Sequence, residues 1–252
     1  MCVETTKVKC YACEGDTRNL FSGVQQCLNC GHISDYTVPI DSQGYCEDKA
    51  DDKNDYREAP QEDYIRMKQR WDFVTKHASG CDSLLDFGCA DNLFIKCAPA
   101  GHGFKELIPF DTNWLTGFSD ERVLDRYYDV VTLWHVLEHI TNPKMVTERI
   151  PHKYLFVIIP WVENISIEEI PTTRLFFHGR HVHFYTKKSF MNIFGNDYEI
   201  LEESHEDGKL INLEKDIVGF AMKRKTWDDT TVIPPRRGIY ERFYGDSQAE
   251  AV

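Results

Sequence analysis

The sequence reads Leu84-Leu85-Asp86-Phe87-Gly88-Cys89-Ala90-Asp91-Asn92-Leu93-Phe94 where the first third of its 252 residues ends. An apolar run ends in the carboxylate of Asp86, Gly88 follows two residues later, and turn-forming residues lead into a second apolar segment. This order is typical of a strand that passes through a turn into a helix beside a nucleotide. Glycine lets the backbone approach a ligand, and the first amides of the helix are unpaired donors. We therefore expect Asp86 to accept a cationic or hydroxyl-bearing group.

Two neighbouring segments support a ligand site, although an Asp-x-Gly turn alone is as often structural. Residues 106–110 are followed by Asp111, about twenty residues after the turn opens, where an acid that binds ribose hydroxyls belongs. Residues 129–134 are mostly apolar, without a regular alternation of polar residues, which is typical of a strand buried on both faces. Because ligands of open α/β sheets lie beyond the carboxyl ends of the strands, these strand ends are expected to surround one site.

Two later segments carry further motifs. Residues 136–143 read Val-Leu-Glu-His-Ile-Thr-Asn-Pro, and residues 181–190 read His-Val-His-Phe-Tyr-Thr-Lys-Lys-Ser-Phe. With the turn, they resemble the small-molecule branch of the class I S-adenosylmethionine-dependent methyltransferases, whose patterns are Leu-Asp-x-Gly-Cys-Gly-x-Gly and Val-Leu-Glu-His-Ile-x-x-Pro. The resemblance covers about residues 66–224, and it departs from the family where Ala90 and Asn92 replace two glycines.

This resemblance implies an α/β fold, a Rossmann-like doubly wound and mostly parallel sheet, together with a cofactor site. The turn would hold the amino acid part of S-adenosylmethionine, and Asp111 would hold its ribose hydroxyls. The residues assigned to cofactor binding are Asp86, Gly88, Ala90, Asn92, Asp111, Trp134 and His135. An NAD-dependent enzyme is disfavoured, because the glycine that brings the helix close to a pyrophosphate is missing.

Histidines are the candidate catalytic residues, since methyl transfer requires alignment of donor and acceptor and in some cases a base. His135 and His139 lie four residues apart, so they share a helical face if the turn after the strand is helical. With Glu138 they lack the spacing of helix-borne zinc motifs, so we expect no metal there. His139 either acts on the substrate or has a structural role.

His181 and His183 are the other candidate catalytic residues, because this family builds much of its acceptor pocket after the fifth strand. The alternative is a half-exposed extended segment in which the two histidines alternate with apolar residues.

Four of the nine cysteines form two Cys-x-x-Cys pairs, Cys10 with Cys13 and Cys27 with Cys30. The two-residue gap lets both sulfurs of a pair face one ion, and two pairs complete a tetrahedral thiolate shell. This spacing predicts a zinc ribbon. The zinc is expected to be structural, because four thiolates leave no open coordination position and so small a segment buries too little apolar surface to fold alone.

Composition limits the other possibilities. The net charge of −12 and a pI near 5.3 argue against broad nucleic-acid binding, which requires a basic face. The apolar runs are too short to cross a membrane, and the N-terminus has no basic stretch followed by an apolar run, so we expect a cytoplasmic protein. Oligomeric state has no signature in the sequence.

The expected organisation is a zinc ribbon over 1–40, an acidic linker over 41–62, the methyltransferase domain over 63–225 and a C-terminal extension over 226–252. A helix is expected from residue 63 to 74, with Trp71 in the core. The predicted strands cover 83–86, 106–110, 129–134, 154–159, 197–202 and 217–223, the last two as an antiparallel edge pair. A stunted further strand is expected around 122–124.

Two functions remain open at this point. The first is methyl transfer from S-adenosylmethionine to a small-molecule or carrier-linked acceptor at oxygen, carbon or nitrogen. The second is a noncatalytic binding protein with an altered cofactor turn, whose ribbon docks a protein or nucleic-acid partner.

Overall fold

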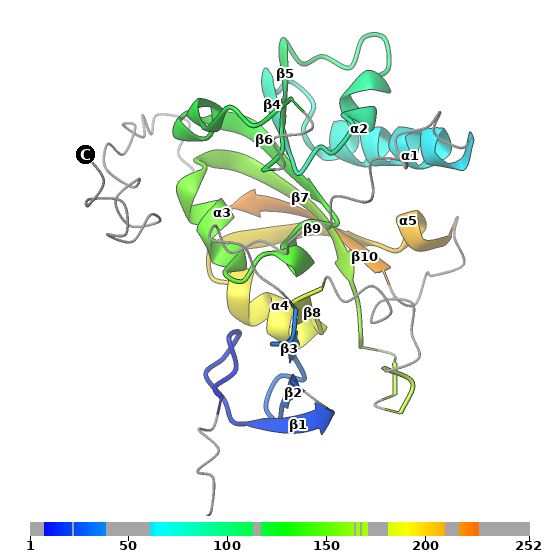
Figure 1. Ribbon diagram of the computed structural model, residues 1–252. Coiled ribbons are helices and arrows are strands. Elements are labelled where there is room, and N and C mark those ends of the chain that lie inside the picture. The colour runs from blue at the N-terminus through cyan, green and yellow to red at the C-terminus, as the bar shows by residue number, and fades with distance from the viewer. Residues whose placement is uncertain are drawn as a thin grey trace, which may run out of the picture.

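The main sheet has six strands in the order β5-β4-β6-β7-β10-β9. The computed structural model describes residues 8–21, 23–38, 61–112, 117–163, 165–166, 168–170, 181–209 and 217–226. The strands are β4 (Ser83–Phe87), β5 (Glu106–Phe110), β6 (Tyr128–Trp134), β7 (His152–Pro160), β9 (Tyr198–Ser204) and β10 (Ile217–Arg224). β5, β4, β6 and β7 are parallel, whereas β10 runs antiparallel to both β7 and β9 (Figure 1). This confirms the predicted Rossmann-like sheet and its antiparallel edge.

The predicted strand around residues 122–124 is wrong. Glu121–Asp125 form a 3-10 helix, η3, because the Asp120 side chain accepts the Arg122 amide and starts a helical turn. The chain then enters β6 directly, so the sheet ends at β5 on this side.

Helices cover both faces of the sheet, as expected for a doubly wound fold (Figure 1). On one face lie α1 (Gln61–His77) and α2 (Leu93–Lys96), and on the other lie α3 (Pro143–Arg149) and α4 (Lys187–Phe194). Trp71 of α1 is fully buried, as predicted, and stacks on Phe94 with ring centroids 4.5 Å apart. On the opposite face, Phe190 of α4 stacks on Phe220 at 4.2 Å. The short α5 (Glu206–Lys209) joins β9 to β10 and contacts α1.

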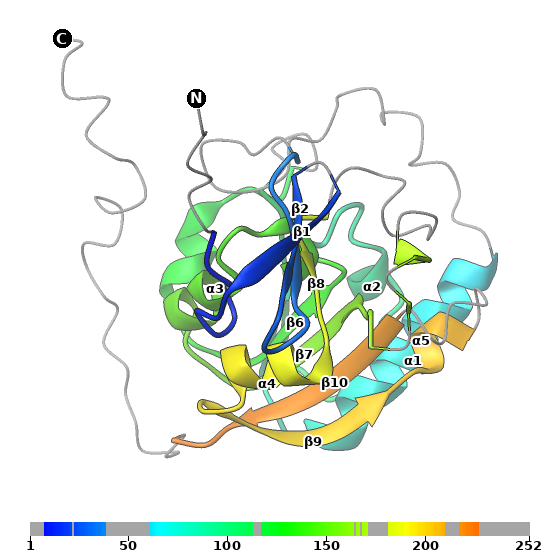
Figure 2. The ribbon, with the colours of Figure 1, turned by 90° about the horizontal axis from the view of Figure 1, so that it is seen from below.

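The N-terminal residues form a second, antiparallel sheet that includes a strand from the main domain. Its strands are β1 (Thr17–Phe21), β2 (Val24–Cys27), β3 (Ile33–Asp35) and β8 (His183–Phe184), paired in that order. Figure 2 shows this sheet lying across the end of the molecule that carries β8. The ribbon is therefore joined to the larger domain by strand pairing between β3 and β8.

Two predictions of organisation lie mostly outside the described residues, namely the linker over 41–62 and the extension over 226–252. Among the helices that the structure does describe, none has the combination of length and apolar character that a bilayer crossing requires.

Candidate functional site

The glycine turn links the ends of three neighbouring strands. The amides of Gly88 and Cys89 both donate to the Phe110 carbonyl, at 2.7 and 3.0 Å, and so tie the turn to the end of β5. Gly88 has φ +79°, and a Cβ at this residue would lie 2.4 Å from Cγ2 of Val136, just after β6. Glycine is therefore required here by both the backbone conformation and the available space.

The two residues that replace family glycines keep a glycine-like backbone. Ala90 has φ 48° and Asn92 has φ 65°, both in the left-handed region. The Ala90 amide donates to Oδ2 of Asp111 at 2.8 Å, which fixes that carboxylate across the turn. The turn and Asp111 therefore form one unit, as the spacing predicts.

The helix expected after the turn is only one turn long. α2 covers four residues, and the Leu93 amide at its start donates to Oδ1 of Asp91. The expectation that unpaired helix amides face a ligand is therefore wrong for Leu93, because a neighbouring side chain already accepts its hydrogen bond.

Asp86 is the penultimate residue of β4 and is buried, with 1% of its surface exposed. Its Oδ1 accepts a hydrogen bond from the Thr132 hydroxyl at 2.7 Å. Burial raises the pKa of Asp86 to about 7, against the opposing effects of Thr132 and the Arg70 charge. The carboxyl therefore titrates near neutral pH, and its charge state is sensitive to a cation placed nearby.

Beside Asp86 lies a buried ion pair that sequence reasoning missed. Arg70 of α1 donates to both carboxylate oxygens of Asp207 in α5, at 2.8 and 2.9 Å, and its guanidinium lies 5.3 Å from the centre of the Trp134 ring. Although burial opposes ionisation, the Arg70 charge holds the pKa of Asp207 well below its usual range. These two residues are 137 positions apart, so no local pattern could have paired them.

His135 does not continue a helix after β6. It has φ 58°, and only Leu137–His139 form a short 3-10 turn, η4. Its ring lies 3.3 Å from Glu138 and 3.4 Å from Asp207. Burial opposes the charged imidazole, but these two carboxylates outweigh it and raise the pKa of His135. The predicted common helical face with His139 is therefore wrong.

His139 instead lies beside His181, from a distant part of the chain. Their ring centroids are 4.8 Å apart with the planes at 79°, an edge-to-face arrangement. Together with Glu138, each offers one ligand atom, and these three atoms lie within 4.8 Å of one another. The structure thus joins two predicted catalytic residues with a buried carboxylate.

His183 occupies a different environment from His181. Its Nε2 donates to the Thr141 carbonyl at 3.1 Å, so its Nδ1 accepts from Nε2 of His32 in the ribbon at 3.0 Å. Burial lowers the pKa of His183 to about 4. Because both ring nitrogens are engaged by the protein, we expect a positioning role for His183. The alternative of a half-exposed segment is also wrong, since His183 and Tyr185 are buried together with Val182 and Phe184.

The four predicted metal ligands of the ribbon meet at one point. The Cys10 and Cys30 sulfurs are 3.6 Å apart, and those of Cys13 and Cys27 are 3.5 Å apart. All four sulfurs lie within 4.8 Å of one another. A zinc ion with Zn–S bonds of 2.3 Å places its sulfurs about 3.8 Å apart, so this cluster could hold zinc with little adjustment.

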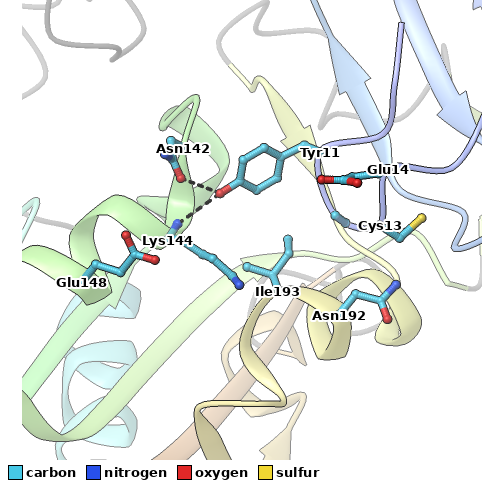
Figure 3. Close-up of a pocket in the computed structure, with 9 residues that line it drawn as sticks. Tyr11, Cys13, Glu14, Asn142, Lys144, Glu148, Asn192 and Ile193 are labelled. Carbon is cyan, nitrogen blue, oxygen red and sulfur yellow. Dashed lines mark hydrogen bonds between the residues drawn. The ribbon is translucent and has the colours of Figure 1, made fainter.

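A polar cleft of about 490 Å³ lies where the ribbon meets α3 and α4 (Figure 3). Tyr11 spans it, donating to Oδ1 of Asn142 at 2.5 Å and accepting from the Lys144 amide at 3.3 Å. Its ring also lies 5.3 Å from that of His183, so the cleft wall and the ribbon junction share side chains.

Comparison with protein families decides the assignment. Residues 55–202, more than half of the chain, match the family model described as a methyltransferase domain. The chain belongs to this methyltransferase family. Its fold is that of the class I methyltransferases, and the site described above lies within the matched region except for Asp207 and the ribbon. No curated protein matches the methyltransferase chain.

Several solved methyltransferase structures resemble the chain. A small RNA methyltransferase is 18% identical with a TM-score of 0.44, and the match covers 67% of this chain and 26% of that protein. The plantazolicin methyltransferase BpumL in complex with SAH is 14% identical with a TM-score of 0.45, covering 66% and 86% of the two chains. The magnesium protoporphyrin IX methyltransferase from Synechocystis with bound SAH is 12% identical with a TM-score of 0.43, covering 65% and 84%.

Proposed function

We propose that this methyltransferase uses S-adenosylmethionine and transfers its methyl group to a small-molecule or carrier-linked acceptor. The observation that carries the proposal is the unit formed by the turn and Asp111, in which the Ala90 amide orients the carboxylate at the end of β5. When bound, S-adenosylmethionine supplies an electrophilic methyl group on a sulfonium. Asp111 would bind the ribose hydroxyls, and the backbone of the turn from Gly88 to Asn92 would lie along the cofactor.

The remaining cofactor residues would act through charge and shape. Asp86 would place a carboxyl of pKa about 7 under the amino acid part of the cofactor. Trp134 is the last residue of β6, the strand next to Asp86, and His135 follows it. These two residues would form the adjoining wall of the cofactor site. His139 and His181 would orient the acceptor or take its proton, because they lie together just beyond the same strand.

The conformation of the turn favours this proposal over the noncatalytic alternative. A turn that had lost its ligand would be free to leave the left-handed region, which costs an L-residue about 1–2 kcal/mol. Ala90 and Asn92 nevertheless keep positive φ values, and Gly88 keeps its close approach to Val136. These left-handed conformations, which glycine adopts readily, support a turn that still serves a ligand despite the two substitutions.

We propose a structural zinc for the ribbon. Its sulfurs approach one another as a closed tetrahedral shell requires, and four thiolates leave no position for a substrate. Metal analysis of the full chain should find zinc bound at the ribbon, and the Cys10→Ser/Cys13→Ser variant should lose this zinc together with ribbon stability. Unchanged zinc content in the variant would contradict the ligand set.

Calorimetric titration of the zinc-loaded full chain with S-adenosylmethionine and S-adenosylhomocysteine tests the cofactor. Asp111→Ala should weaken both by about 10- to 100-fold, because hydrogen bonds to a charged group contribute about 1.5–3 kcal/mol. The matched control is Asp82→Ala, which removes an exposed carboxylate paired with Lys105 at the opposite end of β4. Absence of binding by the wild-type chain at millimolar ligand, or equal loss in both variants, would refute the proposal.

A further inference from the structure

The cluster of Glu138, His139 and His181 has a feature that packing does not explain. Glu138 is fully buried, between the imidazoles of His135 on one side and of His139 and His181 on the other. Apart from the ion pair with His135, neither of its carboxylate oxygens accepts a hydrogen bond from a described residue. A buried carboxylate whose oxygens accept no hydrogen bond is costly, and such groups are normally fully paired, hydrogen-bonded or bound to a metal.

From this arrangement we propose that Glu138, His139 and His181 bind a divalent transition-metal ion. One carboxylate and two imidazoles form a ligand set that leaves coordination positions open, unlike the closed shell of the ribbon. The three ligand atoms lie within 4.8 Å of one another, and metal bonds of about 2.0–2.2 Å would draw them inward around one centre. His139 and His181 are partly exposed, so the open positions face solvent.

The backbone already holds the two ligand segments together. The Val182 amide donates to the Glu138 carbonyl at 2.7 Å, and the Tyr185 hydroxyl donates to the Leu137 carbonyl at 3.1 Å. These bonds fix His181 beside Glu138 and His139 independently of any ion. On the other side of the carboxylate, His135 lies 3.3 Å from Glu138 and 3.4 Å from Asp207. A carboxylate ligand held by a neighbouring partner is typical of metal sites.

The proposed metal ion would have a role in methyl transfer. An open coordination position accepts a hydroxyl or enolate oxygen and lowers its pKa, so the ion would orient and activate an oxygen of the acceptor. His139 and His181 would then act as ligands and not as bases. This role rests on the proposed function, whereas the presence of the ion does not.

Metal binding to the full chain with its ribbon already loaded with zinc tests the site. The probes are Zn²⁺, followed by calorimetry, and Mn²⁺, followed by the loss of its free-ion electron paramagnetic resonance signal. We expect one further ion per chain, because thiolates do not select Mn²⁺ and the ribbon is already filled. His181→Ala and Glu138→Gln should each weaken binding by at least about 10-fold, the scale seen when even supporting residues of metal sites are removed.

The matched control is His205→Ala, because His205 pairs with Glu203 at 3.6 Å without belonging to the cluster. Its metal affinity should equal that of the wild-type chain. His181 is partly exposed, so His181→Ala keeps the test informative even if Glu138→Gln fails to fold. No binding of either ion by the wild-type chain, or unchanged binding in His181→Ala, would overturn the proposal. Titration with S-adenosylmethionine, run separately, reports failure of the proposed function.

Discussion

Replacing Gly88 by alanine tests whether the turn is built as the structure indicates. The alanine would have to adopt φ +79°, which costs an L-residue about 1–2 kcal/mol. Its Cβ would also lie 2.4 Å from Cγ2 of Val136, and overpacking of this kind costs about 1–3 kcal/mol. The two contributions together lower the free energy of unfolding by about 2–5 kcal/mol.

Gly80 provides a matched control. It has nearly the same φ, +82°, but nothing lies within 4 Å of the Cβ that an alanine would add. Gly80→Ala should therefore cost only the conformational part, about 1–2 kcal/mol. Urea denaturation of both variants in zinc-containing buffer measures the two losses. Equal losses in Gly80→Ala and Gly88→Ala would refute the close approach of the turn to Val136.

A double variant separates strain from overlap. Val136→Ala removes the methyl group that the new Cβ would meet, so Gly88→Ala/Val136→Ala should destabilise by less than the sum of the single variants. Cofactor affinity should fall in Gly88→Ala and remain unchanged in Gly80→Ala. Additive stability losses in the double variant would show that the contact does not contribute.

Three further predictions follow from individual contacts. Ala90→Gly should raise the free energy of unfolding by about 0.5–1 kcal/mol in urea denaturation, because relief of the left-handed penalty exceeds the entropy that glycine adds. Asp86 carries a proton below pH about 7, so calorimetry should show affinity for the cationic cofactor falling as pH decreases through 7, and Asp86→Asn should remove this dependence. Arg70→Met should destabilise by about 3–5 kcal/mol because it leaves the Asp207 charge buried without its bidentate partner and with only the more distant His135 beside it, and Arg70→Met/Asp207→Leu should recover much of this loss in the same denaturation assay.

The sheet could be predicted because each strand is a local apolar run that ends at turn-forming residues. All six predicted strands of the main sheet are present, and their boundaries differ by only a few residues. The failures occurred where a few residues decide the structure. The side-chain cap at Asp120 turned the expected strand around residues 122–124 into a 3-10 helix.

The candidate site could be predicted only where its residues follow strand ends. Asp86 and Asp111 lie near the carboxyl ends of β4 and β5, as predicted, because parallel strands bring these ends to one edge. No comparable rule predicts the Arg70–Asp207 pair or the contact between His139 and His181. Each contact depends on elements that are distant in the sequence and meet only in the folded chain. The sequence therefore identifies the individual residues but not which residue each one contacts.

The segment around β8 explains why the ribbon belongs to the site. His181 faces Glu138, His183 accepts a hydrogen bond from His32 of the ribbon, and Tyr185 holds the backbone before Glu138. One short segment therefore fixes the candidate metal ligands and the ribbon at the same time. Because β8 also pairs with β3, a shift of the ribbon would displace His181 relative to Glu138. If the ribbon binds zinc as proposed, the energy of that binding would also hold the segment that carries His181 in place.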